Sequence, residues 1–196
     1  MNGDLAAWVL AGGKSSRMGA DKAFLQLGGR TLLDRALDVL RTLTPDCHIV
    51  GSGAKFELFG PVLEDIYQDR GPLGGIHAAL SASTKDLNLV LAVDLPHVPA
   101  PFLEFLVDRA RKSGAVLTVP RAGGGWQPLC AVYRRDFLPV AEQALNAGKN
   151  KIDPLFERVS LAIVEESDLK KTGFSEKIFQ NLNTPAEFES AAKGIR

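Results

Sequence analysis

Short apolar runs alternate with amphipathic helical segments through nearly the whole chain. The clearest run, Leu87–Val93, is followed directly by Asp94, and a similar run occupies Leu5–Leu10. Strands this apolar are typical of a parallel sheet that helices cover on both faces. The pattern therefore predicts an α/β fold, a three-layer sandwich around a mostly parallel sheet, with residues 1–196 forming one domain.

The other helices and strands are predicted from the spacing of apolar residues, which repeats every two residues in a strand and every 3.6 residues in a helix. Shorter apolar runs predict strands at residues 48–50, 61–66, 115–119, 129–133 and 161–164. Apolar side chains at helical spacing predict helices at residues 32–43, 72–82, 101–112 and 136–145, with a last helix beginning at Pro185.

Charge and composition exclude several classes of partner. The 23 basic and 23 acidic residues give a formal net charge of zero, so no overall field attracts nucleic acid or an anionic membrane. Only Cys47 and Cys130 occur, far apart and outside any metal-ligand spacing, which favours a reducing cytoplasm. No basic, apolar leader precedes Leu5, and no run approaches the roughly 20 apolar residues that span a bilayer. We expect a soluble, cytoplasmic protein that binds its ligands through local groups.

A glycine-rich loop follows the first strand, between Gly12 and Gly19. Glycines let backbone N–H groups approach phosphate oxygens closely, and consecutive amides form an anion-binding concavity. The loop and its end also carry three cations, Lys14, Arg17 and Lys22. A polyphosphate ligand would relieve their mutual repulsion, although a plain strand-to-helix turn with solvated charges accounts for the same residues.

This loop matches neither of the two best-known nucleotide motifs. In a Walker A loop ending at Gly13-Lys14-Ser15, the first glycine would fall at Trp8. The G-x-G-x-x-G of dinucleotide-binding turns is started only by Gly51-Ser52-Gly53, where Phe56 replaces the third glycine.

Two acidic residues are candidates for the chemistry. Asp94 ends the apolar strand, at the sheet edge where ligands of open α/β folds bind. A carboxylate there suits Mg²⁺, which takes one or two protein carboxylates plus substrate phosphates. Asp69 precedes a Gly-Pro turn. For Asp94 taken alone, a helix cap or a strand-end aspartate bonded to local amides is the more common explanation, and ordinary turn chemistry explains Asp69.

Five motifs, in order, resemble those of the MobA-type molybdenum cofactor guanylyltransferases. The first is Leu10-Ala11-Gly12-Gly13-x-Ser15-x-Arg17-Met18-Gly19-x-Asp21-Lys22; the others are Asp69 with Gly71-Pro72-Leu73-Gly74-Gly75, Val93-Asp94-Leu95-Pro96, Gln127-Pro128-Leu129, and Asn181-x-Asn183-Thr184-Pro185. The match extends from about Val9 to Glu187. As a set these motifs are specific, whereas each one after the first is weak alone.

The resemblance implies a nucleotide-diphospho-sugar transferase-like (Rossmann-like) fold. It also implies the reaction, in which GTP and molybdenum-loaded molybdopterin give molybdopterin guanine dinucleotide and pyrophosphate. Magnesium would be the cofactor, and proteins that deliver the molybdenum cofactor would make transient contacts. Neither nucleic acid nor a membrane is implied as a partner.

Site residues are carried over from the same motifs. Asp94 would bind Mg²⁺, Lys22 the phosphates and Arg17 the leaving pyrophosphate, which makes these three the catalytic candidates. The nucleotide would be held by Leu10, Ala11, Gly12, Gly13, Asp69 and Gly71. The pterin would face Gln127, Asn181 and Asn183, although Thr184, Pro185 and Glu187 also form a helix-capping pattern that explains the last motif.

One departure concerns the end of the second strand. Where family members often offer an asparagine to the nucleotide, this chain has Gly51-Ser52-Gly53. Ser52 or the backbone would have to make that contact, or it is absent. The sister enzymes that attach cytosine usually carry Ala in place of Gly12 and Pro in place of Asp21. By analogy, the Leu10-Ala11-Gly12-Gly13 form and Gly71-Pro72-Leu73 therefore favour GTP.

The mechanism implied needs no catalytic base. A phosphate monoester is already an anionic nucleophile, so catalysis reduces to positioning and electrostatics. Accordingly, His48, His77 and His97 show no triad-like pattern, and we interpret them as structural or surface residues. Two alternatives stay open: the same chemistry with CTP or with a sugar-phosphate acceptor, and a non-catalytic GTP-binding adaptor.

Overall fold

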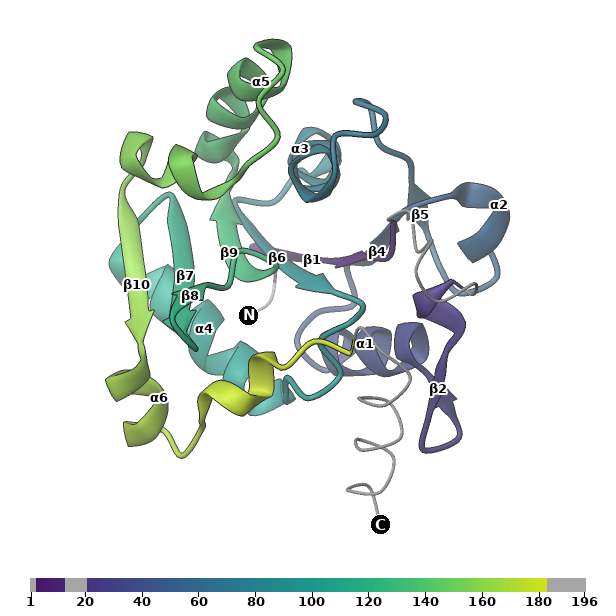
Figure 1. Cartoon of the computed structure of the whole chain (residues 1–196), viewed down its shortest axis with the longest axis horizontal. Helices are drawn as coiled ribbons and strands as arrows, with labels where there is room; N and C mark the ends of the chain where they lie inside the picture. The colour runs from purple at the N-terminus through teal and green to yellow at the C-terminus, as the bar shows by residue number, and fades with distance from the viewer. Residues whose placement is uncertain (1–2, 13–20, 183–196) are drawn as a thin grey trace.

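A central twisted sheet organises the computed structural model, which describes residues 3–12 and 21–182 (Figure 1). Within these residues the sheet has eight strands, and seven of them follow the order β10-β7-β9-β6-β1-β4-β5. The eighth, β8, pairs only with β7. In chain order they are β1 (Leu5–Leu10), β4 (Cys47–Val50), β5 (Val62–Leu63), β6 (Leu87–Ala92), β7 (Leu117–Ala122), β8 (Gly125–Trp126), β9 (Cys130–Arg134) and β10 (Leu161–Glu165).

Most of the pairings are parallel, as the sequence predicts. β1 pairs in parallel with both β4 and β6, β4 with β5, and β10 with β7. β9 is antiparallel to both β6 and β7. Since β6 and β7 are both antiparallel to β9, they run in the same direction, and β10 runs with β7. The carboxyl ends of β1, β4, β6, β7 and β10 therefore lie at one edge of the sheet.

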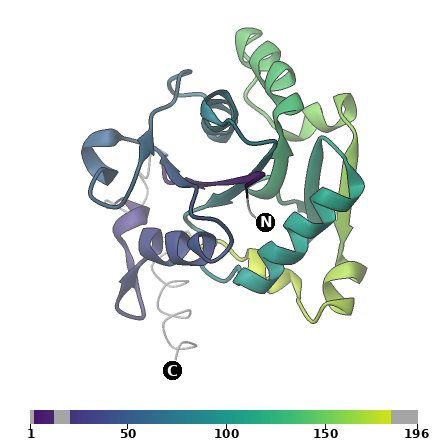
Figure 2. The same cartoon turned by 180° about the vertical axis from the view of Figure 1, so that it is seen from behind.

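Helices cover both faces of the sheet, which confirms the three layers (Figures 1 and 2). One face carries α3 (Pro72–Ala82) and α5 (Leu138–Asn146). The other carries α1 (Leu32–Arg41), α4 (Ala100–Ser113) and α6 (Glu166–Lys171). A short helix, α2 (Gly53–Phe56), and a small hairpin of β2 (Gln26–Leu27) and β3 (Arg30–Thr31) lie beside the edge strand β5 and helix α1. No helix in the described residues is long and apolar enough to cross a membrane.

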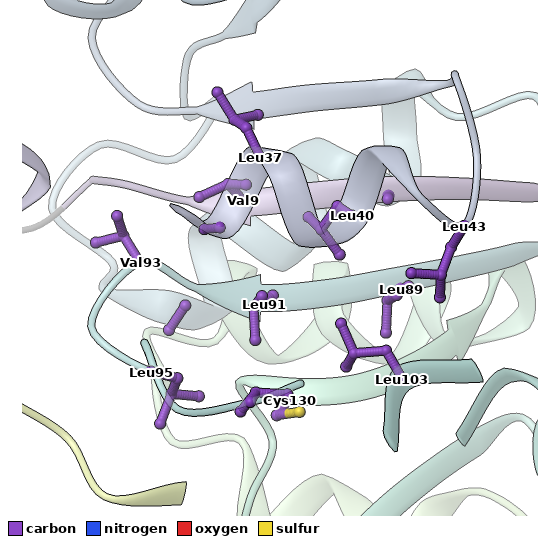
Figure 3. Close-up of a cluster of buried hydrophobic side chains, with 14 of the residues drawn as sticks. Val9, Leu37, Leu40, Leu43, Leu89, Leu91, Val93, Leu95, Leu103 and Cys130 are labelled. Atoms are coloured by element: carbon purple, nitrogen blue, oxygen red, sulfur yellow. The ribbon is translucent and has the colours of Figure 1, made fainter. Parts of the chain in front are cut away.

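The core forms two hydrophobic clusters, one on each face of the sheet. In β1, Leu5, Ala7 and Val9 join the cluster under α1 and α4, whereas the alternate residues join the one under α3. Figure 3 shows the larger cluster, where side chains from the strands meet those from α1 and α4. Because both faces are covered, every residue of β1 and β6 is buried. This burial explains why these strands are almost uniformly apolar in sequence.

Local signals set the helix boundaries. The Thr31 hydroxyl accepts a hydrogen bond from the Asp34 amide at 3.0 Å and begins α1. Pro72 occupies the first turn of α3, which spans the predicted residues 72–82. Gly114, with φ of 64°, ends α4 in a left-handed cap.

Two expectations differ from the structure or lie outside it, and several short elements were not predicted. Only Val62–Leu63 of the predicted strand at 61–66 joins the ladder, because the chain then turns away toward α3. The unpredicted elements are α2, α6, β2, β3 and β8, since two to six residues carry too little periodicity. The predicted helix from Pro185 lies outside the described residues.

Asn88 is a buried polar residue in the middle strand pair. Its side chain is 0% exposed, and its Oδ1 accepts a hydrogen bond from the Trp8 indole at 3.0 Å. Its Nδ2 donates to the Lys85 carbonyl at 3.1 Å. This amide satisfies the indole N–H that the core would otherwise leave unpaired.

We expect Asn88→Ala to lower the free energy of unfolding by about 2 kcal/mol or more, because it leaves a buried donor unpaired. Urea denaturation measures the effect. Asn146→Ala is the control: its exposed amide accepts from the Tyr67 hydroxyl at 2.7 Å and should cost less than about 1 kcal/mol. Equal losses in the two variants would contradict this role of Asn88.

Candidate active site

The carboxyl edge brings together the first loop and Asp94. The amides of Ala11 and Gly12 both donate to the Val50 carbonyl, at 3.0 and 3.1 Å. The Val93 amide donates to the Leu10 carbonyl at 3.1 Å. These bonds extend the pairing of β1 with β4 and β6 past the ends of the strands, so that the start of the glycine-rich loop and the segment carrying Asp94 are held side by side.

Lys22 and Asp94 form an ion pair at the centre of this edge. Lys22 Nζ lies 3.3 Å from Asp94 Oδ2, and the two side chains are 21% and 22% exposed. Lys22 begins a 3-10 turn, Lys22–Phe24, whose N-cap is Asp21; the Asp21 carboxylate accepts from the Ala23 amide at 3.2 Å. Residues 72 positions apart in sequence thus meet in the fold, and a cation and a carboxylate occupy the same small region.

Lys55 links helix α2 to the same turn. Its Nζ lies 2.9 Å from Asp21 Oδ2. Because this pair is partly exposed, its contribution to stability is modest. Its effect is positional, since it ties α2 to the residue that caps the Lys22 turn.

Glycines allow helix α3 to pack tightly against the strands. A Cβ atom on Gly75 would lie 3.3 Å from Leu10 Cδ2 and 3.4 Å from Val50 Cγ1, and one on Gly74 would lie 3.0 Å from the Tyr67 carbonyl. The first turn of α3 therefore sits directly beside the end of β1. This close approach gives a physical reason for the paired glycines of the second motif.

The turn before α3 has unusual backbone geometry. Asp69 has φ of 59° and Gly71 has φ of 63°. A left-handed conformation is uncommon for a residue other than glycine, although aspartate tolerates it better than most. Asp69 is exposed and lies at the rim of the edge, close in sequence to the first turn of α3.

Asp65 is a candidate that the sequence analysis missed. Its carboxylate oxygens lie 3.7 and 3.6 Å from the positions that Cβ atoms would take on Gly74 and Gly75, so it sits against the first turn of α3. Among the described residues, its carboxylate has no hydrogen-bond or ion-pair partner. Burial raises its pKa above the ordinary value. A partly buried, unpartnered acid beside the first loop is typical of a binding residue. Asp65 falls within the strand predicted at residues 61–66, whereas β5 ends at Leu63 and Asp65 follows it.

The departure at residues 51–53 has a steric cause. A Cβ atom on Gly51 would lie 2.7 Å from the Phe56 ring, so no side chain fits directly after β4. Ser52 is exposed and precedes α2 without a side-chain capping bond. Its neighbour Gly53 donates its amide to Glu64 Oε1 at 2.9 Å. Ser52 is therefore the first position after β4 that can offer a side chain to a ligand.

The residues expected on the acceptor side are placed differently from one another. Leu182 donates its amide to the Asp94 carbonyl at 3.2 Å, which brings the exposed Asn181 next to the site. Gln127 instead donates its side-chain amide to the Ala122 carbonyl at 3.1 Å, within its own hairpin. Gly13, Arg17 and Asn183 lie outside the described residues.

The three histidines lie in different surroundings. His48 lies 2.6 Å from Asp46 and stacks on Trp8 with ring centroids 4.6 Å apart. His77 is buried on α3, where burial lowers its pKa. His97 follows the Asp94 segment, and burial, with a smaller effect of the Arg35 charge, lowers its pKa. Their interpretation as structural or surface residues stays a prediction.

A divalent cation at this edge would depend on Asp94. Within the described residues, no group of three or more His, Cys, Asp or Glu side chains could hold a metal. A single hard carboxylate fits an ion that takes its remaining ligands from phosphates and water. Lys22 now neutralises this carboxylate, so a cation would compete with the ammonium group for it.

The carboxyl edge of the sheet thus gathers the start of the glycine-rich loop, a lysine–aspartate pair and a partly buried acid, at the place where open α/β sheets bind their ligands. Comparison with known proteins makes the class specific. The family model for the MobA-like NTP transferase domain matches residues 7–162, and the chain belongs to this family of nucleotidyltransferases.

Relatives and solved structures agree with this assignment. The chain is 33% identical to a probable molybdenum cofactor guanylyltransferase of Carboxydothermus hydrogenoformans, over 97% of this chain and 96% of that one. It is 32% identical to the molybdenum cofactor guanylyltransferase of Syntrophotalea carbinolica, over 94% and 89%. The crystal structure of molybdopterin-guanine dinucleotide biosynthesis protein A from Archaeoglobus fulgidus superposes with a TM-score of 0.84 at 26% identity, covering 96% and 97% of the two chains.

We expect Asp65→Asn to raise the Tm at pH 7. The pKa of Asp65 is raised in the folded protein, so above that pKa the buried charge destabilises the fold relative to the unfolded chain. The gain should shrink as the pH falls toward about 4, near the carboxyl pKa of an unfolded chain, where both states bind the proton. Thermal unfolding at the two pH values measures this. Asp136→Asn, on an exposed turn, is the control, and a lower Tm for Asp65→Asn at pH 7 would refute the expectation.

Proposed function

We propose that this chain transfers GMP from GTP to the terminal phosphate of molybdenum-loaded molybdopterin, releasing pyrophosphate. The observation that carries the proposal is the Lys22–Asp94 pair beside the Leu10–Gly12 turn, at the carboxyl edge of the sheet. The names of the relatives over nearly the whole chain support guanine and molybdopterin as the substrates. We further propose that the whole chain acts as one domain, in the cytoplasm, and meets cofactor-delivery proteins transiently.

The reaction is an in-line displacement at the α-phosphorus of GTP. An oxygen of the acceptor phosphate forms the new P–O bond, while the bond between the α-phosphorus and the bridging oxygen breaks and pyrophosphate leaves with the electron pair. The acceptor oxygen is already anionic, so no protein base is required. The residues of this chain contribute alignment and compensation of charge.

Lys22 and Asp94 would exchange partners during binding. A Mg²⁺ ion held by Asp94 would withdraw charge from the α-phosphate oxygens. Lys22, released from the carboxylate, would turn toward the phosphates as they arrive. Asp21 and Lys55 would keep the Lys22 turn in place during this exchange. Arg17 would face the leaving pyrophosphate.

The nucleoside would lie between the first loop and the start of α3. The backbone of Leu10, Ala11, Gly12 and Gly13 would contact the nucleotide, and Ser52, Asp69 and Gly71 would contact it from the neighbouring loops. Asp65 would accept hydrogen bonds from the ring N–H and the 2-amino group of guanine, since a carboxylate matches two adjacent donors. On the acceptor side we propose Asn181, Asn183 and the Gln127 loop.

The direct test combines nucleotide binding with turnover. GTP and CTP are titrated against the protein by calorimetry in the presence of Mg²⁺, and pyrophosphate release is then measured with molybdopterin as acceptor. Preferential binding of GTP and release that requires molybdopterin would support the proposal. Preference for CTP would reassign the base, and binding of GTP without pyrophosphate release would favour an adaptor.

We expect Asp94→Asn to lower kcat about 10²–10³-fold, because the substitution removes the carboxylate charge that would hold Mg²⁺ beside the reacting phosphates. Pyrophosphate release at saturating GTP and Mg²⁺ measures the effect. Asp108→Asn, an exposed acid paired with Arg111 on α4, is the control and should retain activity. Near wild-type turnover of Asp94→Asn would remove Asp94 from the mechanism.

We expect Asp65→Asn to weaken GTP binding about 10–100-fold while changing ITP binding less, because ITP lacks the 2-amino donor. Since only the ionised carboxylate accepts both bonds, wild-type affinity for GTP should fall as the pH drops through the raised pKa of Asp65. Calorimetry with both nucleotides between pH 4.5 and about 7.5 tests this. An unchanged ratio of GTP to ITP affinity in the variant would show that Asp65 does not contact the base.

A further inference from the structure

A second hollow lies on the same edge of the sheet, away from the nucleotide loop. It has a volume of about 630 Å³ and is lined by Arg121, Ala122, Gly124, Glu165, Glu166 and Ser167. These residues belong to the ends of β7 and β10, to the turn before β8 and to the start of α6. None of them takes part in the nucleotide site described above.

The position of the hollow relative to Asp94 follows from the sheet. β7 points the same way as β6, with the antiparallel β9 between them. Where β7 pairs with β9, at Leu117 and Thr118, it lies two strand spacings of about 4.8 Å from β6. Its carboxyl end pairs with β8 instead, so the hollow lies farther along the same edge from Asp94. An elongated ligand could therefore extend from Asp94 toward the hollow along this edge.

A chain segment connects the two places. After α6 the chain (yellow in Figure 1) runs back toward β6, and the Leu182 amide bonds to the Asp94 carbonyl. Phe174 and Phe179 each pack against Phe102 with ring centroids 5.4 Å apart. These contacts hold the segment against α4, so the distance between the hollow and Asp94 is fixed by the core.

Arg121 is held in a defined orientation at the hollow. Its Nε and Nη2 donate to the two carboxylate oxygens of Glu165 at 3.2 and 2.8 Å. Its guanidinium carbon lies 5.3 Å from the centre of the Trp126 ring. The side chain is nevertheless 51% exposed. A guanidinium has five N–H donors, so donors remain for a ligand.

Glu166 supplies an oriented acceptor on the other side. Its Oε1 accepts the Gly123 amide at 2.9 Å, and a carboxylate has capacity for further bonds. Gly123 and Gly124 have φ of 62° and 78°, and no atom lies within 4 Å of the position of a Cβ on either. The space on the Cβ side of these two glycines is therefore open, and a flat ligand can approach it.

The chemistry of the hollow does not suit a phosphate. The lining carries one guanidinium, that of Arg121, and two carboxylates, those of Glu165 and Glu166, so its formal charge is negative and would repel an anion. A heterocycle with adjacent N–H and amino donors and a nearby carbonyl fits better. The carboxylate matches the two donors, and the guanidinium matches the carbonyl.

We propose that this hollow binds the amino-oxo ring of the pterin in the acceptor, with Glu166 taking its N–H donors and Arg121 its carbonyl. The inference rests on the proposed function and deepens it. An acceptor that reaches both places carries its phosphate at one end, near Asp94, and its ring at the other, as molybdopterin does. Arg121 and Glu166 would then determine which phosphate monoesters are accepted.

The test uses Arg121→Met and Glu166→Gln in the full chain. We expect each to raise the KM for molybdopterin about tenfold or more, because a hydrogen bond to a charged group is lost. The kcat should change less than about threefold, since contacts remote from the reacting phosphorus bind substrate and transition state alike. GTP affinity by calorimetry should stay at the wild-type value, which also confirms that the variants fold. Unsubstituted pterin, followed by its fluorescence, should bind the wild type more tightly than either variant.

Arg111→Met is the matched control. Arg111 makes the same two-bond contact with a carboxylate, that of Asp4, at 3.0 and 2.9 Å, but at the opposite edge of the sheet. It should leave the KM for molybdopterin unchanged. Wild-type KM values for both Arg121→Met and Glu166→Gln would overturn the pterin site alone. A wild-type protein that binds GTP but releases no pyrophosphate with molybdopterin would overturn the proposed function and this inference with it.

Discussion

Parallel pairing of β1 with both β4 and β6 is the constraint on which the rest of the structure depends. Because the three strands run the same way, their carboxyl ends meet, and the ladder continues past them through the Val50 and Leu10 carbonyls. Every residue of β1 and β6 is buried, so both faces of this strand pair contribute to the hydrophobic core. The candidate site thus begins where two fully buried strands end.

The charged side chains at the carboxyl edge pair with one another in the free protein, and bound ligands would take the place of these partners. Lys22 and Asp94 neutralise one another in the free protein, and Asp21 and Lys55 do the same one residue away. Phosphates and a cation would satisfy the same groups from the ligand side, so binding need not create an uncompensated charge at any stage. Asp65 differs, because its partly buried carboxylate lacks a partner within the described residues. The proposed contact with guanine would account for this destabilising charge, since binding groups commonly lower the stability of a fold.

Several elements were predictable because a local signal coincided with a tertiary need. Helix α3 has its predicted bounds: Pro72 fixes its first turn, and its apolar residues face the sheet. β5 is shorter than predicted because the length of an edge strand depends on where the chain leaves the ladder. No particular residue type marks that point in the sequence. Gln127 belonged to a family motif, yet its side-chain amide bonds to its own hairpin. Asp65 was overlooked because its distinction is its burial against Gly74 and Gly75, and burial is a property of the assembled fold.

The sequence by itself determined the fold class and the family, because periodicity and ordered motifs are written along the chain. It also placed Asp94 and the glycine-rich loop at carboxyl ends of strands, since each directly follows an apolar run in the chain. Tertiary structure alone decided which groups meet: Lys22 with Asp94, Lys55 with Asp21, and Arg121 with Glu165. These partners are 72, 34 and 44 residues apart. Which strands become neighbours depends on the packing of whole helices against the sheet, and no local pattern encodes that choice.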